Sequence, residues 1–231
     1  MQRVLNFLEK LHDNNNREWF HAHKAEYLVA QNIFNEFAME FLKGIRSFDD
    51  TVGDLRLQDI TYRIYRDTRF SKDKSPYKNH MGVYVCPGGK KSGFGGYYLQ
   101  ISAAHEGGWE EGHMLAVGDY RAEPKVVRTI REDILNGDGD FRKILAGLDS
   151  RFILDTSLSL KKVPAGFPAD SPDADYFRLK NYLISYTPDT EFITSAGMLE
   201  EVISIFKTAA PFIHYINRAI EFCKEDNYYS W

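Results

Sequence analysis

Two short runs of alternating residues constrain the fold of this chain more than any other feature. Residues 81–85 and 97–101 each alternate apolar and polar positions, which is typical of a strand with one buried face. Only the glycine-rich stretch PGGKKSGFGG (87–96) separates them. Parallel strands need a crossover of about a dozen residues or more, whereas a short loop joins antiparallel strands. The spacing therefore predicts an antiparallel hairpin.

Two neighbouring segments extend this hairpin to a sheet. Ile60, Tyr62 and Ile64 alternate with more polar positions, so we expect a strand over 60–65. A further strand is expected over 107–115, where Trp109, Glu111 and His113 alternate with their neighbours. The short connections predict an antiparallel meander of about four strands.

Helical periodicity occupies both ends of the chain. Apolar residues at helical spacing predict a helix over 2–12, and a second helix runs to about Ser47. Asn15 followed by Glu18 has the spacing of a capping box, so Asn15 is expected to cap that second helix. Near the C-terminus a helix begins at about Ser195, and Pro211 should kink or split it.

The middle of the chain supplies shorter elements. Helices are expected over 124–135 and 139–147, and strands over 152–160 and 176–186. No repeat or long linker divides the 231 residues. The prediction is one α+β domain over residues 1–231, an antiparallel β-meander covered by N-terminal and C-terminal helices.

Composition excludes several classes of protein. Cys86 and Cys223 are the only cysteines, too few for a disulfide framework or a thiolate zinc site. No signal-peptide core and no run of 18 apolar residues occurs, so we expect a cytoplasmic chain without a membrane partner. The net charge of −4 argues against a globally cationic nucleic-acid binder. Nucleic acid is thus not excluded as a partner, but it is not favoured.

The positive charge is concentrated in one segment. Residues 56–80 hold seven Arg and Lys against three Asp, although the remainder of the chain is strongly acidic. The centre of the segment reads RIYRDTRFSKDKSPYKNH (63–80), in which the stretch 71–76 has turn-forming residues. A polar loop at a strand end is a common place for functional groups.

Two interpretations of this segment remain open. Asp67 and Asp73 could pair with neighbouring cations as internal ion pairs, or the arginines could bind an external anion, since the guanidinium group suits carboxylate and phosphate. The candidate ligand-binding residues are Arg63, Arg66, Asp67, Arg69, Ser71, Lys72, Asp73, Lys74, Tyr77 and Lys78.

The chain resembles a known family in two motifs. The first is Asn14-Asn15-x-Arg17-Glu18-Trp19-Phe20, and the second is the segment from Arg63 to Lys78. Both resemble an uncharacterised conserved family called domain of unknown function 2461, over nearly the whole chain. The resemblance implies a single soluble domain. It implies no activity, cofactor or catalytic residue.

Other candidate sites are weaker. His105, Glu106, Glu110, Glu111 and His113 lie close in sequence, but the helical spacing of a zinc-binding HExxH motif is absent. Glu111 and His113 would share one strand face, where a divalent metal could bind, but we name no metal ligand. The glycine-rich stretch 87–96 joins two strands instead of opening a helix, so it is expected to be a hairpin tip and not a phosphate loop.

Three functional hypotheses follow. The first is a domain that binds an anionic small molecule, or less favourably a nucleic-acid backbone, through residues 63–78. The second is a hydrolase or transferase acting on a phosphorylated substrate, with Asp67 or Asp73 as base or Mg²⁺ ligand. The third is a structural ion-pair network in a protein-interaction domain. No cofactor and no catalytic residue is named.

Overall fold

A five-stranded antiparallel sheet organises the molecule in the computed structural model, which describes residues 1–103 and 112–228. The strands are β1 (His80–Val85), β2 (Gly96–Ser102), β3 (Met114–Asp119), β5 (Tyr182–Tyr186) and β4 (Ile153–Leu154), in that spatial order. Val83 lies opposite Leu99, and Leu99 lies opposite Leu115. The predicted α+β class with an antiparallel sheet is confirmed.

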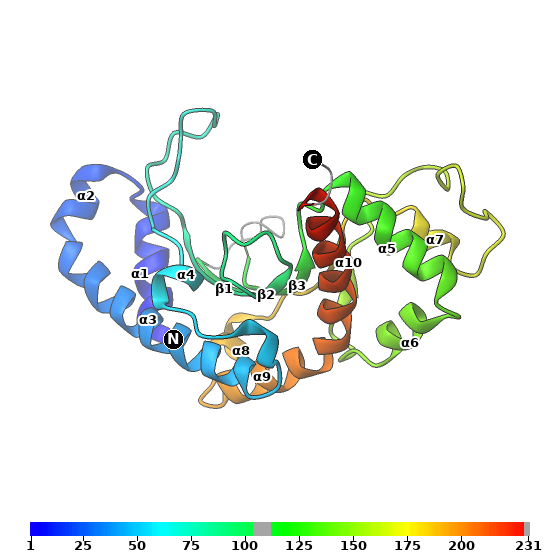
Figure 1. Cartoon of the computed structure of the whole chain (residues 1–231). Helices are drawn as coiled ribbons and strands as arrows, with labels where there is room; N and C mark the ends of the chain where they lie inside the picture. The colour runs from blue at the N-terminus through cyan, green and yellow to red at the C-terminus, as the bar shows by residue number, and fades with distance from the viewer. Residues whose placement is uncertain (104–111, 229–231) are drawn as a thin grey trace.

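Helices from both ends of the chain cover one face of the sheet (Figure 1). These are α1 (Gln2–Asp13), α3 (Lys24–Arg46), α9 (Met198–Thr208) and α10 (Ala210–Tyr228). The core between them is rich in aromatic rings. Phe206 packs edge-on against Phe41 and Tyr97, with ring centroids 5.6 and 5.7 Å apart.

Shorter helices connect these elements. They are α2 (Arg17–Ala22), η1 (Asp50–Val52), α4 (Leu57–Ile60), α5 (Pro124–Asn136), α6 (Asp140–Ala146), α7 (Ala174–Phe177) and α8 (Thr190–Thr194). The expected helices over 124–135 and 139–147 are therefore confirmed. In the described residues, no helix is both long enough and apolar enough to cross a membrane.

The two faces of the sheet differ in character. Strand alternation directs Val83, Leu99 and Leu115 into the main core beneath the sheet. The opposite face carries a separate small apolar cluster of Met114, Ala116 and Leu183, with Tyr98 packed against it. This second face is where the molecule is hollowed.

The prediction of a strand over 60–65 is wrong. Residues 57–60 form α4, and the chain then makes single bridges at Thr61–Val83 and Tyr65–Tyr77. Instead of extending the sheet, residues 61–79 fold back on themselves. The amide of Arg66 donates to the carbonyl of Pro76, and that of Lys78 to the carbonyl of Ile64. Ile60 and Ile64 are both buried, as the alternating pattern indicated, but Ile60 lies in a helical turn and Ile64 in an irregular stretch. The pattern alone does not distinguish this arrangement from a strand.

Several boundaries also differ from expectation. The second helix is interrupted at His23, and its N-cap is Asn16, which accepts from the Trp19 amide, whereas the Asn15 side chain bonds to Tyr77. The strand expected over 107–115 begins at Met114, and residues 104–111 lie outside the described residues. Within 176–186, only the part from Tyr182 is strand. The last helix splits into α9 and α10 next to Pro211, as predicted.

Candidate functional site

Residues 61–79 form an arm that projects beyond the sheet (Figure 1). Its base is held by the first family-like motif. Tyr77 stacks on Phe20 with ring centroids 4.0 Å apart. The Asn15 side chain accepts from the Tyr77 amide (3.1 Å) and donates to the Tyr77 carbonyl (3.0 Å) and to Asn79 (2.8 Å). The two motifs therefore meet at the root of the arm.

The outer part of the arm contains internal ion pairs. Arg69 holds Asp67 with two bonds of 3.0 and 2.7 Å, and Arg66 pairs with Asp73. Asp73 also accepts from the amide and hydroxyl of Ser75. The Arg69 contacts lower the pKa of Asp67 to about 2, and the Ser75 and Arg66 hydrogen bonds lower that of Asp73. Strongly depressed carboxylates are weak bases, so this geometry does not suit either for general base catalysis.

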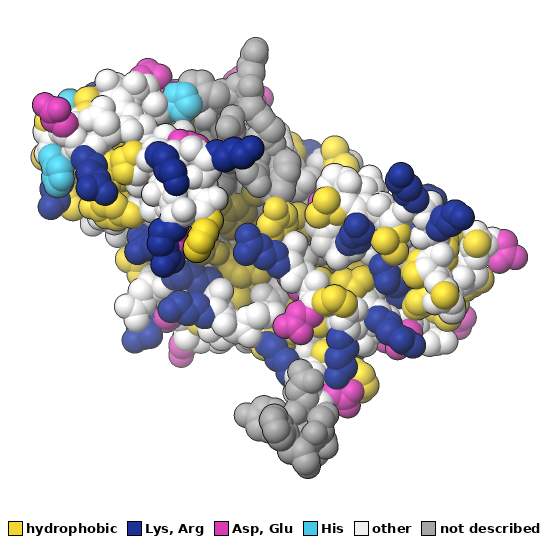
Figure 2. All heavy atoms as spheres, turned by 90° about the horizontal axis from the view of Figure 1, so that it is seen from above, with side chains coloured by type: hydrophobic (Ala, Val, Ile, Leu, Met, Phe, Trp, Pro, Cys, Tyr) yellow, Lys and Arg dark blue, Asp and Glu magenta, His cyan; other side chains and the backbone are white. Residues whose placement is uncertain are grey.

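A groove of about 1030 Å³ lies on the sheet face opposite the main core, between the arm and α10. Figure 2 shows this hollow with apolar side chains on its floor and Lys and Arg side chains around it. The floor is formed by side chains of β1, β2, β3 and β5: Tyr84, Tyr98, Gln100, Met114, Ala116 and Leu183.

Lys78 and Lys90 stand at the end of the groove next to the arm. Their amines lie 5.3 and 5.5 Å from the ring centroid of Tyr62. Lys90 also donates to the backbone carbonyls of Gln58 and Thr61. Lys78 is half-buried, and among the described residues no carboxylate oxygen lies within 4 Å of its amine. Burial, followed by the charges of Arg63 and Lys90, lowers the pKa of Lys78.

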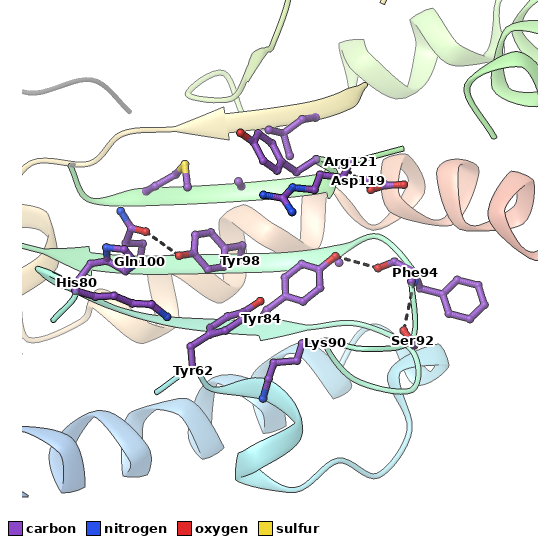
Figure 3. A pocket seen from close by; sticks show the side chains of 18 of the residues that line it. Tyr62, His80, Tyr84, Lys90, Ser92, Phe94, Tyr98, Gln100, Asp119 and Arg121 are labelled. Carbon is purple, nitrogen blue, oxygen red and sulfur yellow. Dashed lines mark hydrogen bonds between the residues drawn. The ribbon is translucent and has the colours of Figure 1, made fainter. Parts of the chain in front are cut away.

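His80 reports the same positive environment. It begins β1 and lines the groove (Figure 3), as does Lys78. Burial, together with the charges of Lys78 and Arg66, lowers the pKa of His80 to about 4. The imidazole is therefore neutral at pH 7.

The opposite end of the groove has mixed charge. Asp119 ends β3 and accepts from the Arg121 amide at 3.0 Å, while the Arg121 side chain extends over the groove (Figure 3). Burial raises the pKa of Asp119. Lys224 lies 3.5 Å from the ring centroid of Phe94 and donates to the Ser92 carbonyl. This end therefore offers both donors and acceptors.

The structure distributes the predicted site residues over three places. Arg66, Asp73, Tyr77 and Lys78 line the groove, and Arg63 lines a narrow recess beside Lys78. The others lie on the outer part of the arm: Asp67, Arg69, Ser71, Lys72 and Lys74. Arg66 additionally borders a smaller pocket of about 300 Å³, shared with Arg17 and His21.

Sequence reasoning missed the partners that complete the groove. Lys90, Arg121 and Tyr84 line it but lie outside the charged segment 56–80, and His80, the last residue of that segment, is not among the candidate residues. Lys90 lies in the glycine-rich hairpin tip that we interpreted as purely structural. No spacing rule links these positions, because they come together only when the strands pair.

The histidine and glutamate cluster over 105–113 lies only partly in the described residues. Of the cluster 105–113, only His113 lies in the described residues. It accepts from the Ser102 amide at 3.2 Å and contacts Thr190, and it is buried. Within the described ranges, no three His, Cys, Asp or Glu side chains gather in a way that could hold a metal ion.

Comparison with known proteins gives a family but no activity. The family model described as "Conserved hypothetical protein (DUF2461)" matches residues 3–215. The chain belongs to this family. No curated protein and no solved structure matches it.

Proposed function

We propose that this protein binds an anionic ligand, bearing phosphate or carboxylate groups, at the end of the groove next to the arm. The observation that carries the proposal is Lys78, a half-buried amine with no carboxylate within 4 Å in the described chain. Lys90 and Arg66 would assist it, while Tyr62 provides a ring face to both lysine amines.

The energetic argument rests on the proximity of like charges. Because both amines lie near one ring, Lys78 and Lys90 are at most about 11 Å apart. At an effective dielectric constant of about 20, two unit charges at that distance repel each other by about 1.5 kcal/mol. A bound dianion would attract both amines and so offset this repulsion. Two neighbouring cations of this kind favour a preorganised anion-binding site over a set of internal ion pairs.

The groove also suits a ligand larger than a single anion. Its volume of about 1030 Å³ lies at the upper end of the range for small-molecule sites, which are about 300–1000 Å³. Tyr84, Tyr98 and Met114 supply an apolar floor for the uncharged part of the ligand. The anionic group would then bind beside the arm.

The test compares two lysines. Pyrophosphate, citrate and a nucleoside triphosphate are added at low ionic strength, and the melting temperature and binding isotherm are measured. We expect at least one anion to stabilise the wild type, and Lys78→Gln to weaken its binding at least about tenfold. Lys207→Gln, an exposed lysine on α9 outside the groove, is the matched control. If no anion binds, or if Lys78→Gln binds as tightly as the control, the proposal is wrong.

A hydrolase or transferase acting on a phosphorylated substrate is the second candidate, favoured by Asp119. The pKa of this groove carboxyl is raised, first by burial and further by Glu123, although the Arg121 amide and Lys224 oppose the shift. Such a carboxyl suits general acid–base chemistry better than Asp67 or Asp73. Turnover of phosphate esters by the wild type, lost in Asp119→Asn, would support an enzyme. Absence of turnover across a phosphate-ester panel would count against it.

A further inference from the structure

We propose that the physiological anion is a single-stranded nucleic acid, which runs along the arm and into the groove. This inference rests on the proposed function, because it names the ligand class of the same site. It requires two features beyond an anion pocket: rings that are accessible to bases, and cations that continue beyond the groove. The arm provides both.

Exposed aromatic rings and cations alternate along the arm. Phe70 at the tip is 96% exposed, while Tyr62 and Tyr65 near the base are 45% and 50% exposed. The guanidinium carbon of Arg69 lies 5.8 Å from the Phe70 ring centroid, and the amines of Lys78 and Lys90 lie beside Tyr62. Stacking of bases on such rings, with cations following the backbone, is the general mode of single-strand recognition.

The extent of the surface favours a polymer over a mononucleotide. The Arg66 amide donates a hydrogen bond to the Pro76 carbonyl across the arm, and Phe70 follows Arg66 by four residues toward the tip. At ~3.3 Å per extended residue, Phe70 can stand up to ~13 Å beyond Arg66. Lys72 and Lys74 are exposed on the same outer part, whereas Lys78 and Lys90 lie at the groove. One nucleotide in the groove would leave the tip without a contact.

Charge complementarity also selects this surface from the rest of the molecule. Residues 56–80 carry an excess of four positive charges in a chain of net charge −4, so the charge of the remaining residues sums to −8, although Lys90, Arg121 and Lys224 among them add cations at the groove. Binding would therefore be confined to the arm and the groove. An anionic lipid surface would engage the tip alone and would leave the tyrosine floor and Lys78 unused. A single strand engages both regions.

The experiment separates the tip from the groove. Binding of fluorescent single-stranded RNA and DNA of about twelve nucleotides, a duplex of equal length, and a mononucleotide is measured by anisotropy at about 50 and 200 mM salt. The variants are Phe70→Ala and Lys78→Gln. Phe222→Ala, an exposed phenylalanine on α10 that does not line the groove, is the matched control for the tip.

We expect the single strands to bind more tightly than the duplex and the mononucleotide, with affinity that falls steeply with salt. Loss of one stacked base corresponds to about 1–3 kcal/mol, so Phe70→Ala should weaken binding by about 5- to 160-fold and Phe222→Ala should not change it. Lys78→Gln should weaken both the oligomer and the mononucleotide. The relative affinity of RNA and DNA distinguishes the two sources of the strand.

Three outcomes would overturn the inference. If pyrophosphate or a mononucleotide binds through Lys78 but oligomers bind no more tightly, the nucleic-acid inference fails and the proposed anion site stands. If the duplex binds as tightly as the single strand, or if Phe70→Ala has no effect, stacking on the arm is wrong. If no anion binds at all, both proposals fail together.

Discussion

Two charged residues on opposite sides of the sheet differ in how many hydrogen-bonding and ionic partners they have. Beneath the sheet, Asp49 is 2% exposed and fully engaged. It accepts from the amide and hydroxyl of Thr51, from the Tyr97 hydroxyl at 2.7 Å, and from His214 at 3.0 Å. Above the sheet, Lys78 has a neighbouring ring and other cations, but no acidic partner in the part of the chain that the structure describes.

The difference separates structural charge from charge available for binding. A buried charge with complete hydrogen bonding ties elements together, here η1, β2 and α10 around Asp49. A partly buried charge without a partner opposes folding and gains only when a ligand arrives. The arm shows both kinds, because Asp67 and Asp73 are paired internally, whereas Lys78 at its base has no carboxylate partner among the described residues.

The largest expected effect is a loss of stability when Asp49 is replaced. Asp49→Ala leaves the buried Tyr97 hydroxyl and the Thr51 side chain without their acceptor. We expect the free energy of unfolding to fall by about 2–3 kcal/mol, measured by urea denaturation. Asp54→Ala, which breaks only the exposed pair with Arg46, should change it by less than about 1 kcal/mol. Equal effects of the two substitutions would contradict a structural role for the Asp49 network.

The next effect concerns the attachment of the arm. Asn15→Ala removes the three hydrogen bonds that hold Tyr77 and Asn79, at a cost of about 1–2 kcal/mol. We expect faster hydrogen exchange at the Arg66 and Lys78 amides, which bond across the arm, with little change in the core strands. Asn32→Ala, which removes a hydrogen bond to Glu36 on the surface of α3, is the control. Unchanged exchange in the arm would show that Asn15 does not anchor it.

A smaller effect is the pH dependence of the Asp49 network. Burial opposes ionisation of Asp49, but hydrogen bonds from Thr51, His214 and Tyr97 outweigh it and lower its pKa. The stability that this group contributes is therefore present above about pH 4, the unfolded value, and is lost as the pH falls through the lower folded value. Between pH 5 and pH 3 the wild type should lose more stability than Asp49→Asn. Parallel losses would exclude a contribution from Asp49.

The smallest expected effect is a gain of stability when Lys78, above the sheet, is replaced. Because the folded-state pKa of Lys78 is lowered, its charge opposes folding at neutral pH, and stability should rise as the pH increases through that value. Lys78→Met is therefore expected to raise the free energy of unfolding slightly, by less than about 1 kcal/mol. Lys207→Met should leave it unchanged. A clear loss of stability in Lys78→Met would place Lys78 among the structural charges and remove the contrast.

The strands predicted over 81–85 and 97–101 could be recognised locally because each has one face against the core. The run 60–65 failed for the same reason, since burial of Ile60 and Ile64 produces the same pattern in a short helix followed by an arm. Asn15 shows a second limit. Its position suggested a helix cap, yet a neighbouring asparagine serves as the cap and Asn15 bonds to Tyr77, which lies 62 positions away.

The sequence by itself determined the α+β class, the antiparallel hairpin, the terminal helices and the location of the concentrated positive charge. These properties follow from local periodicity, loop length and composition. Only the tertiary structure decided which charges are paired. Arg66 and Arg69 pair with carboxylates within seven residues of them in the sequence, whereas Lys78 lies near Lys90 and Tyr62 at one end of the groove. Electrostatic pairing depends on distance in space, and strand pairing sets that distance between residues that no sequence spacing connects.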